Sequence, residues 1–255
     1  MSSRNKNTEA AFLSEYDASS YDRPSTAVDT VIFTVLHEAL HVLIVKRAEH
    51  PYKDCWSLVG GYVDIHQDRA LEETAKRKLE EKTGVKTPYL EQFETIGNKE
   101  RDPRGWSITT VYFALIPSQG ITLQPGKGAA DIKWSKVKDG QVEEELAFDH
   151  AEILHRCIDR LRNKVLYTSL PVYLMPDAFT LGELQKVYEL ILGSPIEHKS
   201  FRRRMLGAEI LEETGEMSYS SKRPAMLYQL KKAQDPHFFV RNLEAAGKSA
   251  AGVDI

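Results

Sequence analysis

The chain has 255 residues and a formal net charge of −3, from 34 basic and 37 acidic side chains, and its length suits one large domain or two modest ones. A hydrophobic fraction of 42% excludes wholesale disorder, no apolar run approaches the ~20 residues that a membrane span needs, and the N-terminus lacks the apolar core of a secretory signal. Two cysteines, Cys55 and Cys157, are too few for a disulfide scaffold or a Cys-rich zinc site, so we expect a cytoplasmic protein with no membrane partner.

The first quarter of the chain predicts an arm followed by strands. Residues 1–25 are polar and have no clear period, which indicates an N-terminal arm. Two β-branched runs, residues 27–35 and 39–45, are separated by a short polar break and predict paired strands of a buried sheet. A third apolar run ends at Gly60 and Gly61, where the backbone can turn sharply.

A helix is predicted over residues 68–83, because apolar side chains recur every four residues at Leu71, Ala75 and Leu79. Asp68 suits its N-cap, and Gly84 suits the position just past its end. Further strand candidates are residues 89–96, 108–116 and 132–134, and a second helix is predicted over 149–165. Strands interspersed with helices indicate an α/β (α+β) domain over residues 26–166, with a mixed sheet between helices.

The pattern changes after a connector, which we place at residues 167–173. Thr180 suits the cap of a helix that runs through Leu192 and ends at Gly193. A second short helix is predicted over 197–206, and an apolar strand over 225–230. A helix, a tight turn, a basic helix and a hairpin-like segment form the order of a winged helix-turn-helix, which we assign to residues 174–255.

Glycines before the first helix and an arginine within it carry the first motif. Gly60-Gly61 is followed by Arg77-Lys-Leu-Glu-Glu-Lys-Thr-Gly84-Val85. This arrangement resembles the Nudix box, G-x5-E-x7-R-E-U-x-E-E-x-G-U, in which U is a bulky aliphatic residue. The resemblance implies a Nudix fold. The loop between Gly61 and Arg77 is longer than in the pattern, and Gln67 stands where the first glutamate is expected.

The charges on this helix depart from the family pattern. The resemblance puts three metal-binding glutamates at positions 78, 81 and 82, where this chain has Lys78, Glu81 and Lys82. These positions share one helix face, and an ammonium offers Mg²⁺ no ligand. We therefore expect no catalytic residues, no metal site and no required cofactor. In an alternative interpretation, Glu73, Arg77 and Glu81 form only a solvated ion-pair ladder, which explains the helix but not the glycines before it.

The segment Arg101-Asp-Pro-Arg-Gly-Trp106 resembles part of Nudix proteins that act on ADP-ribose. Arginine forks suit phosphate groups, and a tryptophan offers a flat face for stacking. A Pro-Arg-Gly surface turn with an ion pair is the simpler alternative. We expect the ligand site to comprise the following residues: Arg47, Gly60, Gly61, Arg77, Glu81, Arg101, Arg104 and Trp106.

The basic helix over 197–206 has an apolar and a charged side. At 100° per residue, Phe201 and Met205 share the face that anchors the helix, and Lys199 and Arg203 point away from it. That arrangement suits a recognition helix in the DNA major groove, although a charge run alone is more often a solvated face. The predicted DNA-binding residues on the helix and at the tip of the wing are Lys199, Ser200, Arg202, Arg203, Arg204, Lys222 and Arg223.

A degenerate Nudix domain joined to a winged helix resembles the NrtR family, the Nudix-related transcriptional regulators of NAD metabolism. The resemblance implies a homodimeric repressor of NAD biosynthesis or salvage genes. It also implies that the dimer binds a palindromic operator and releases it when the Nudix domain binds ADP-ribose as effector. Two alternatives stay open: an active Nudix hydrolase, an ADP-ribose pyrophosphatase with an accessory winged helix, and an interaction protein whose winged helix binds no specific DNA.

Overall fold

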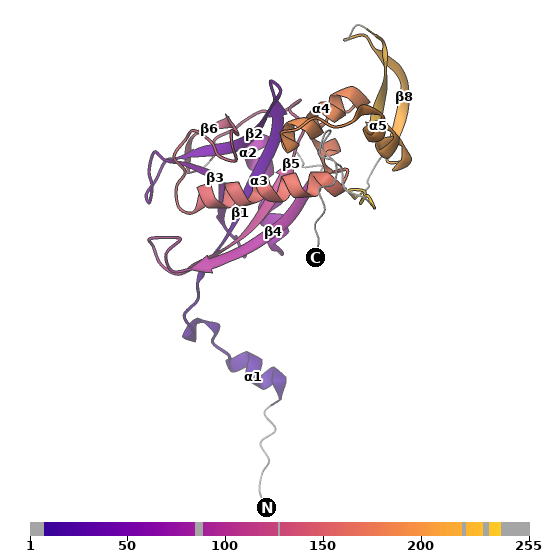
Figure 1. The fold of residues 1–255 in the computed structure, drawn as a ribbon. Coiled ribbons are helices and arrows are strands. Elements are labelled where there is room, and N and C mark those ends of the chain that lie inside the picture. The colour runs from indigo at the N-terminus through magenta and orange to yellow at the C-terminus, as the bar shows by residue number, and fades with distance from the viewer. Residues whose placement is uncertain (1–7, 85–88, 127, 221–222, 232–234, 241–255) are drawn as a thin grey trace, which may run out of the picture.

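The apolar runs in the first part of the chain form the strands of one sheet. The computed structural model describes residues 8–84, 89–126, 128–220, 223–231 and 235–240 (Figure 1). Six strands make up the sheet: β1 (Ser25–Leu36), β2 (Ala39–Arg47), β3 (Trp56–Tyr62), β4 (Tyr89–Asn98), β5 (Ser107–Leu115) and β6 (Ala129–Lys136). They confirm the predicted strands and extend most of them at their ends.

The sheet is mixed, with the strand order β4-β5-β1-β3-β2-β6. β1 runs parallel to β5 and antiparallel to β3, and it also forms a hairpin with β2. Because β1 contacts three other strands, its residues 28–34 are all buried. This buried central strand therefore provides the support from which the neighbouring loops extend.

Two helices cover opposite faces of the sheet. Successive side chains of a strand point to opposite faces, so Ile32 and Phe33 belong to different clusters. Ile32 packs in the cluster of Leu79, on the side of α2 (Leu71–Thr83). Phe33 packs in the larger cluster that contains Leu154, on the side of α3 (His150–Tyr167). The predicted sheet between helices is confirmed (Figure 1).

The start of α2 differs from the prediction. The helix begins at Leu71 after an N-cap residue, Ala70, that provides no side-chain cap. Asp68 is not the cap, because its carboxylate accepts hydrogen bonds from Nε and Nη2 of Arg77, at 2.9 and 2.5 Å. These hydrogen bonds hold the pKa of Asp68 well below its usual range. The end of the helix is as predicted, since Gly84 takes a left-handed conformation and its N–H donates to the carbonyl of Glu80.

The last part of the chain forms the predicted winged helix arrangement. The helices α4 (Leu181–Leu192) and α5 (His198–Gly207) are followed by the wing strands β8 (Leu211–Ser218) and β9 (Ala225–Leu230). A short strand that the sequence did not predict, β7 (Phe179–Thr180), pairs with β9 and completes a three-stranded sheet. The capping box of Thr180 and Glu183 and the left-handed Gly193 fix both ends of α4.

The connector between the two parts is buried. It forms the 3₁₀ helix η2 (Leu170–Leu174), and all five of its residues are buried. One apolar cluster runs without a break from Phe113 of the sheet through Leu161 and Val172 to Phe201 of the basic helix. Tyr188 of α4 crosses the same junction and donates its hydroxyl hydrogen bond to the carbonyl of Thr168, at 2.9 Å. The two parts of the chain therefore share a core.

The N-terminal arm stands apart from this core. In its described part, the helix α1 (Glu9–Glu15) and the 3₁₀ helix η1 (Ala18–Ser20) contain no buried residue, and they project away from the sheet (Figure 1). Within the described residues, no helix combines the length and the apolar character that a membrane crossing requires.

The capping box gives a test of how α4 is held. Thr180→Ala removes the hydroxyl that accepts from the backbone N–H of Glu183, at 3.1 Å, and we expect it to lower the free energy of unfolding by about 0.5–2 kcal/mol. Thr180→Ser keeps the hydroxyl and should lose less. Urea denaturation of the three proteins provides the comparison, and equal losses for the two variants would contradict a capping role.

Candidate functional site

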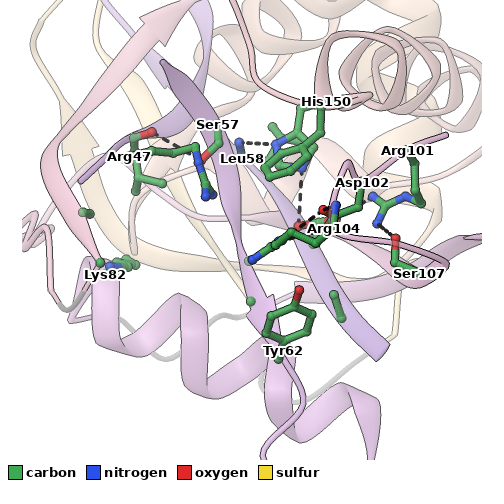
Figure 2. A pocket seen from close by; sticks show the side chains of 18 residues that line it. Arg47, Ser57, Leu58, Tyr62, Lys82, Arg101, Asp102, Arg104, Ser107 and His150 are labelled. Carbon is green, nitrogen blue, oxygen red and sulfur yellow. Dashed lines mark hydrogen bonds and ion pairs between the residues drawn. The ribbon is translucent and has the colours of Figure 1, made fainter. Parts of the chain in front are cut away.

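A cleft opens beside the sheet, where the ends of β1, β2 and β3 meet the loops that precede β5, β6 and α3 (Figure 2). Charged and aromatic side chains surround it. Its lining consists of Ala27, Asp29, Val45, Arg47, Ser57, Leu58, Gly60, Gly61, Tyr62, Lys82, Arg101, Asp102, Arg104, Ser107, Gly128, Ala129, Phe148 and His150. Five of the predicted ligand residues lie here: Arg47, Gly60, Gly61, Arg101 and Arg104.

Gly60 is required by close packing rather than by a turn. The predicted turn at this glycine is wrong, because β3 continues through Gly60 and Gly61 and pairs with β1. A Cβ atom at position 60 would overlap the carboxylate of Asp29 and lie 2.6 Å from the carbonyl oxygen of Val28. The glycine therefore lets β3 approach β1 with a buried carboxylate between them.

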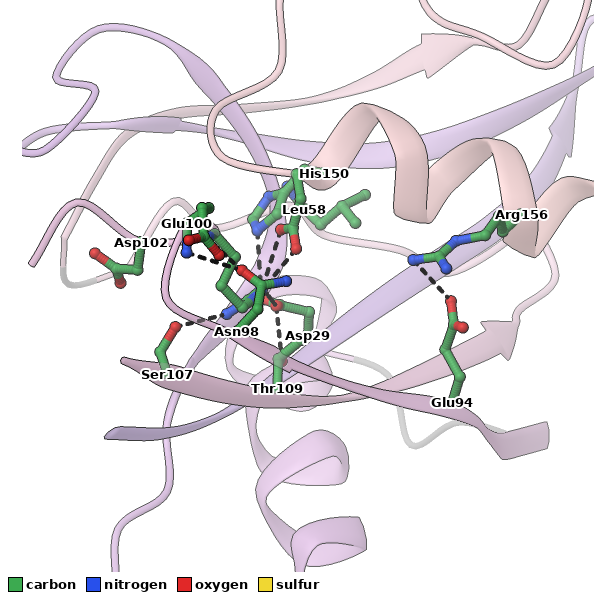
Figure 3. Close-up of polar contacts among 12 residues, drawn as sticks. Asp29, Leu58, Glu94, Asn98, Glu100, Asp102, Ser107, Thr109, His150 and Arg156 are labelled. Carbon is green, nitrogen blue, oxygen red and sulfur yellow. Dashed lines mark hydrogen bonds and ion pairs between the residues drawn. The ribbon is translucent and has the colours of Figure 1, made fainter. Parts of the chain in front are cut away.

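Arg101 is committed to buried carboxylates. Its Nε and Nη2 atoms donate to the two oxygens of Asp149, both at 3.0 Å, and Nη2 also lies 3.4 Å from Asp29, which Figure 3 shows among its polar contacts. The side chain of Arg101 is only 6% exposed, and Thr109 donates a further hydrogen bond to Asp29. Arg101 thus lines the cleft as predicted, but its guanidinium joins β1, the loop before β5 and the start of α3.

His150 completes this buried group from the first turn of α3. Its Nδ1 accepts a hydrogen bond from the backbone N–H of Leu58, at 3.0 Å, so the ring proton lies on Nε2, which faces Asp29 at 3.7 Å. Burial lowers the pKa of His150, and the neighbouring Asp29 and Asp149 oppose that effect. The neutral ring fits its role as acceptor, and it fixes α3 to β3.

Arg104 and Arg47 lie at the mouth of the cleft, beside aromatic rings. Arg104 forms a two-pronged ion pair with Asp102, at 3.0 and 2.7 Å, and its guanidinium lies 5.3 Å from the ring centre of Tyr62. The Arg104 hydrogen bonds hold the pKa of Asp102 below its usual range. The guanidinium of Arg47 lies 4.8 Å from the ring centre of Phe148. Cations and rings together suit a ligand with phosphates and a flat base.

Three predicted ligand residues lie outside the cleft. Arg77 and Glu81 pair with each other on the surface of α2, at 3.0 Å, while Arg77 also binds Asp68 and Glu81 also binds Lys78. Trp106 is 50% exposed and packs beside Gly97 of β4, whose space its ring fills. The structure corrects the placement of all three, because local partners hold them away from the cleft residues.

Several cleft residues were not predicted from the sequence. Tyr62, Phe148 and His150 belong to no motif, and Phe148, in the loop before α3, and His150, in the first turn of α3, lie far along the chain from β3. Lys82 was noticed only as the replacement of an expected glutamate, whereas its side chain lines the cleft and is 7% exposed. The one local signal was that replacement, which puts a cation in the last turn of the helix, on its buried side.

The basic helix presents the charged face that the sequence predicted. Phe201 and Met205 are completely buried, and Phe201 packs against Tyr188 of α4. The predicted residues Lys199, Ser200, Arg202 and Arg203 are all exposed. The side chain of Glu197 caps the helix by accepting from the backbone N–H groups of Lys199 and Ser200. The helix is therefore anchored firmly by one face and presents three cations to an anionic partner on the other.

Arg204 differs from its neighbours. It was predicted to reach DNA from the flank of the helix, but its guanidinium turns back toward the protein. Its Nη2 donates to the carbonyl of Leu166, at 3.1 Å, and its guanidinium lies 4.0 Å from the ring centre of Phe239. Burial in the junction lowers the pKa of Arg204, and the neighbouring Tyr188 opposes that effect. The structure therefore assigns it to holding the helix in place.

The wing carries one described basic residue. Arg223 is exposed just before β9, at the tip of the β8–β9 hairpin, as predicted. The other predicted residue, Lys222, lies outside the described residues.

Comparisons with known proteins agree with this architecture. Residues 25–157 match the family model of the NUDIX domain, and residues 171–230 match that of the NrtR DNA-binding winged helix domain. The chain is 46% identical over 241 residues to the ADPR responsive transcriptional repressor NtrR of Acinetobacter baylyi, which covers 94% of this chain and 95% of that relative.

Two solved structures are similar. The crystal structure of Shewanella oneidensis NrtR complexed with a 27mer DNA has a TM-score of 0.79 and 43% identity, and the match covers 86% of this chain and 99% of that chain. The NUDIX domain of the same protein complexed with ADP ribose has a TM-score of 0.57 and 42% identity. That match covers 60% of this chain and 99% of the other.

The contrast between two cleft arginines gives a test. Arg101→Ala leaves two buried carboxylates without their cation, and we expect it to lower the free energy of unfolding by about 3–5 kcal/mol. Arg104→Ala removes a half-exposed side chain, and we expect a loss of at most about 1 kcal/mol. Denaturant unfolding measures both, and similar small losses would refute a structural role for Arg101.

Proposed function

Since the chain belongs to the NrtR family, with a Nudix domain followed by a winged helix, we propose that it is a DNA-binding transcriptional repressor that ADP-ribose releases from its operator. The observation that carries this proposal is the exposed cationic face of α5 on a winged helix whose core is continuous with that of the Nudix domain. The genes of NAD biosynthesis or salvage are the proposed targets, as the family resemblance implies.

The DNA side of the proposal rests on α5. Lys199, Arg202 and Arg203 are exposed, and opposite them Phe201 and Met205 anchor the helix. A helix of this kind fits the major groove, where arginine and lysine side chains bind phosphates and guanine edges. The exposed Arg223 on the hairpin suits a second contact with the DNA backbone. The similar Shewanella protein was solved with a 27mer DNA, which supports the same use of this domain here.

The ligand side rests on the cleft. Arg47, Lys82 and Arg104 provide positive charge, and the rings of Tyr62 and Phe148 provide flat surfaces. ADP-ribose combines a diphosphate with an adenine ring, so its chemistry suits both features. The related NUDIX domain solved with ADP ribose supports this ligand, as does the name of the Acinetobacter relative.

The donor set on α2 does not fit the Mg²⁺ that a Nudix hydrolase uses. Both oxygens of Glu81 are occupied by Arg77 and Lys78, and the neighbouring Lys82 is a cation. Among the residues that the structure describes, no group of three or more His, Cys, Asp or Glu side chains is placed to hold a metal ion. Mg²⁺ requires clustered oxygen ligands, so we infer that the protein is a sensor and not a hydrolase.

A homodimer is the form in which we expect DNA binding. A two-fold dimer presents two copies of α5 to two half-sites, and it therefore favours a palindromic operator. The coupling between ligand and DNA then requires two arrangements of the dimer with different spacing between the two helices.

The proposal is tested by operator binding with and without effector. We expect Arg203→Ala to abolish or strongly reduce operator affinity, while the affinity of the DNA-free protein for ADP-ribose stays nearly unchanged. The parent protein should lose operator affinity as ADP-ribose is added, by the ~5- to 150-fold that is typical of coupled sites. Fluorescence anisotropy at fixed salt, on operators selected from a palindromic pool, measures both effects.

Lys76→Ala, which removes an exposed cation from α2 of the Nudix domain, provides a matched control for the loss of a surface charge in this assay. If ADP-ribose binds the parent and operator affinity does not change, the sensing function fails. Salt-sensitive DNA binding with no sequence preference would instead favour an interaction protein.

Hydrolysis is the test of the main rival function. We expect no multiple-turnover release of AMP and ribose 5-phosphate from ADP-ribose with Mg²⁺ or Mn²⁺, because the α2 face carries two lysines where carboxylates are needed. Anion-exchange chromatography of the reaction mixture measures the products. Steady, metal-dependent AMP formation that follows the protein through purification would establish a hydrolase.

A further inference from the structure

Lys82 is a buried cation in the wall of the cleft. It lies in the last turn of α2 and is 7% exposed, and its side chain lines the cleft on the same side as Arg47 (Figure 2). Burying an ammonium is costly unless a partner compensates for its lost hydration. Within the described part of the chain, the ion pairs include none between Lys82 and a carboxylate.

The ammonium of Lys82 keeps donor capacity for a ligand. A lysine has three N–H donors, and the described structure gives this one a single hydrogen-bond acceptor, the backbone carbonyl of Pro125. Burial lowers the pKa of Lys82, the nearby Lys78 lowers it further, and the carboxylate of Glu81 opposes both effects. An anion in the cleft would relieve both effects, since it would supply the missing opposite charge.

Arg47 lies at the other end of a short segment that also contacts Lys82. The segment between β5 and β6 passes Lys82, where the backbone N–H of Gln124 donates to the Lys82 carbonyl, and it ends at Ala129, which pairs with Arg47. Arg47 donates its Nε–H to the carbonyl of Pro51, at 2.8 Å, and like Lys82 it binds backbone oxygens rather than a carboxylate in the described structure. Burial and the neighbouring Arg104 lower its pKa.

The other two cleft arginines are already neutralised. Arg101 binds Asp29 and Asp149, and Arg104 binds both oxygens of Asp102. Among the described cleft residues, Lys82 and Arg47 are therefore the cations that form no ion pair with a carboxylate, and they lie on either side of one glycine-containing turn. Gly126 in this turn brings the backbone close to Lys82, since a Cβ there would lie 3.0 Å from the Lys82 Nζ atom.

We propose that Lys82 and Arg47 together bind the diphosphate of the effector directly, so that the cleft takes a nucleoside-diphosphate sugar without a divalent cation. Two fixed cations spaced along a turn suit two linked phosphate groups, which carry their negative charge on the non-bridging oxygens of each phosphate. The inference rests on the proposed ADP-ribose function. Lys82 is then a binding residue in its own right and not merely the remnant of a lost metal ligand.

The test is isothermal calorimetry of the full chain with ADP-ribose, in Mg²⁺ and in EDTA. The parent should bind equally well in both. Lys82→Gln keeps a donor for the Pro125 carbonyl but loses the charge, and it should weaken binding about ten- to a hundredfold. Lys82→Arg keeps the charge and should stay within a few-fold of the parent. Lys76→Gln removes a charge from the exposed face of the same helix and should change nothing.

Arg47→Gln is the second, independent variant, because it removes the other cation without touching α2. It should weaken binding in the same range, and the thermal midpoint of each variant reports whether it folds. Unchanged affinity in Lys82→Gln, or a parent that needs Mg²⁺ to bind, would overturn this inference and leave the ADP-ribose function intact. A folded parent that binds no ADP-ribose under either condition would overturn the proposed function itself.

Discussion

A buried guanidinium sets the geometry of the cleft. Arg101 has its side chain almost fully enclosed, and a charge in that position is stable only when carboxylates surround it. Asp29 from β1 and Asp149 from the start of α3 meet this need, and each is brought there by a different part of the fold. These contacts hold the loop before β5 in its position, because moving it would separate the charges. Arg104 and Asp102 belong to the same loop, so their positions in the cleft are fixed together with it.

α3 connects the cleft to the DNA-binding part. It begins at His150, inside the buried charge cluster, and ends at Tyr167, next to the carbonyl that binds Arg204 of α5. A helix of 18 residues spans about 27 Å, so one rigid element extends from the cleft to the junction with α5. The buried η2 and the shared apolar cluster close the junction around it. A displacement of α3 at the cleft therefore has a continuous packed route to α5.

The features that sequence predicted well depend on neighbours in the chain. The capping of α4 by Thr180 and Glu183, and the end of α2 at Gly84, follow from residues within one helical turn of each other. Some of the errors concern residues whose partners are distant. Arg204 is next to Arg203 in sequence, but its partners Leu166 and Phe239 come from other segments. The cleft position of Phe148 was missed for the same reason, since no local pattern encodes a tertiary contact. The error at Asp68 has another cause, because its partner Arg77 is only nine residues away and the same carboxylate suits either a helix cap or an ion pair.

The inward position of the Arg204 guanidinium bears on how strongly salt weakens DNA binding. A protein that neutralises phosphates displaces condensed counterions, and each neutralised phosphate contributes about −0.9 to the slope of log affinity against log salt. The run from residue 199 to 204 suggests four such contacts per helix, but the structure leaves three, because Arg204 is stacked on Phe239. Under the proposed DNA-binding mode, operator affinity should therefore be less sensitive to ionic strength than the basic run implies, and shape and base contacts should supply a larger share of it.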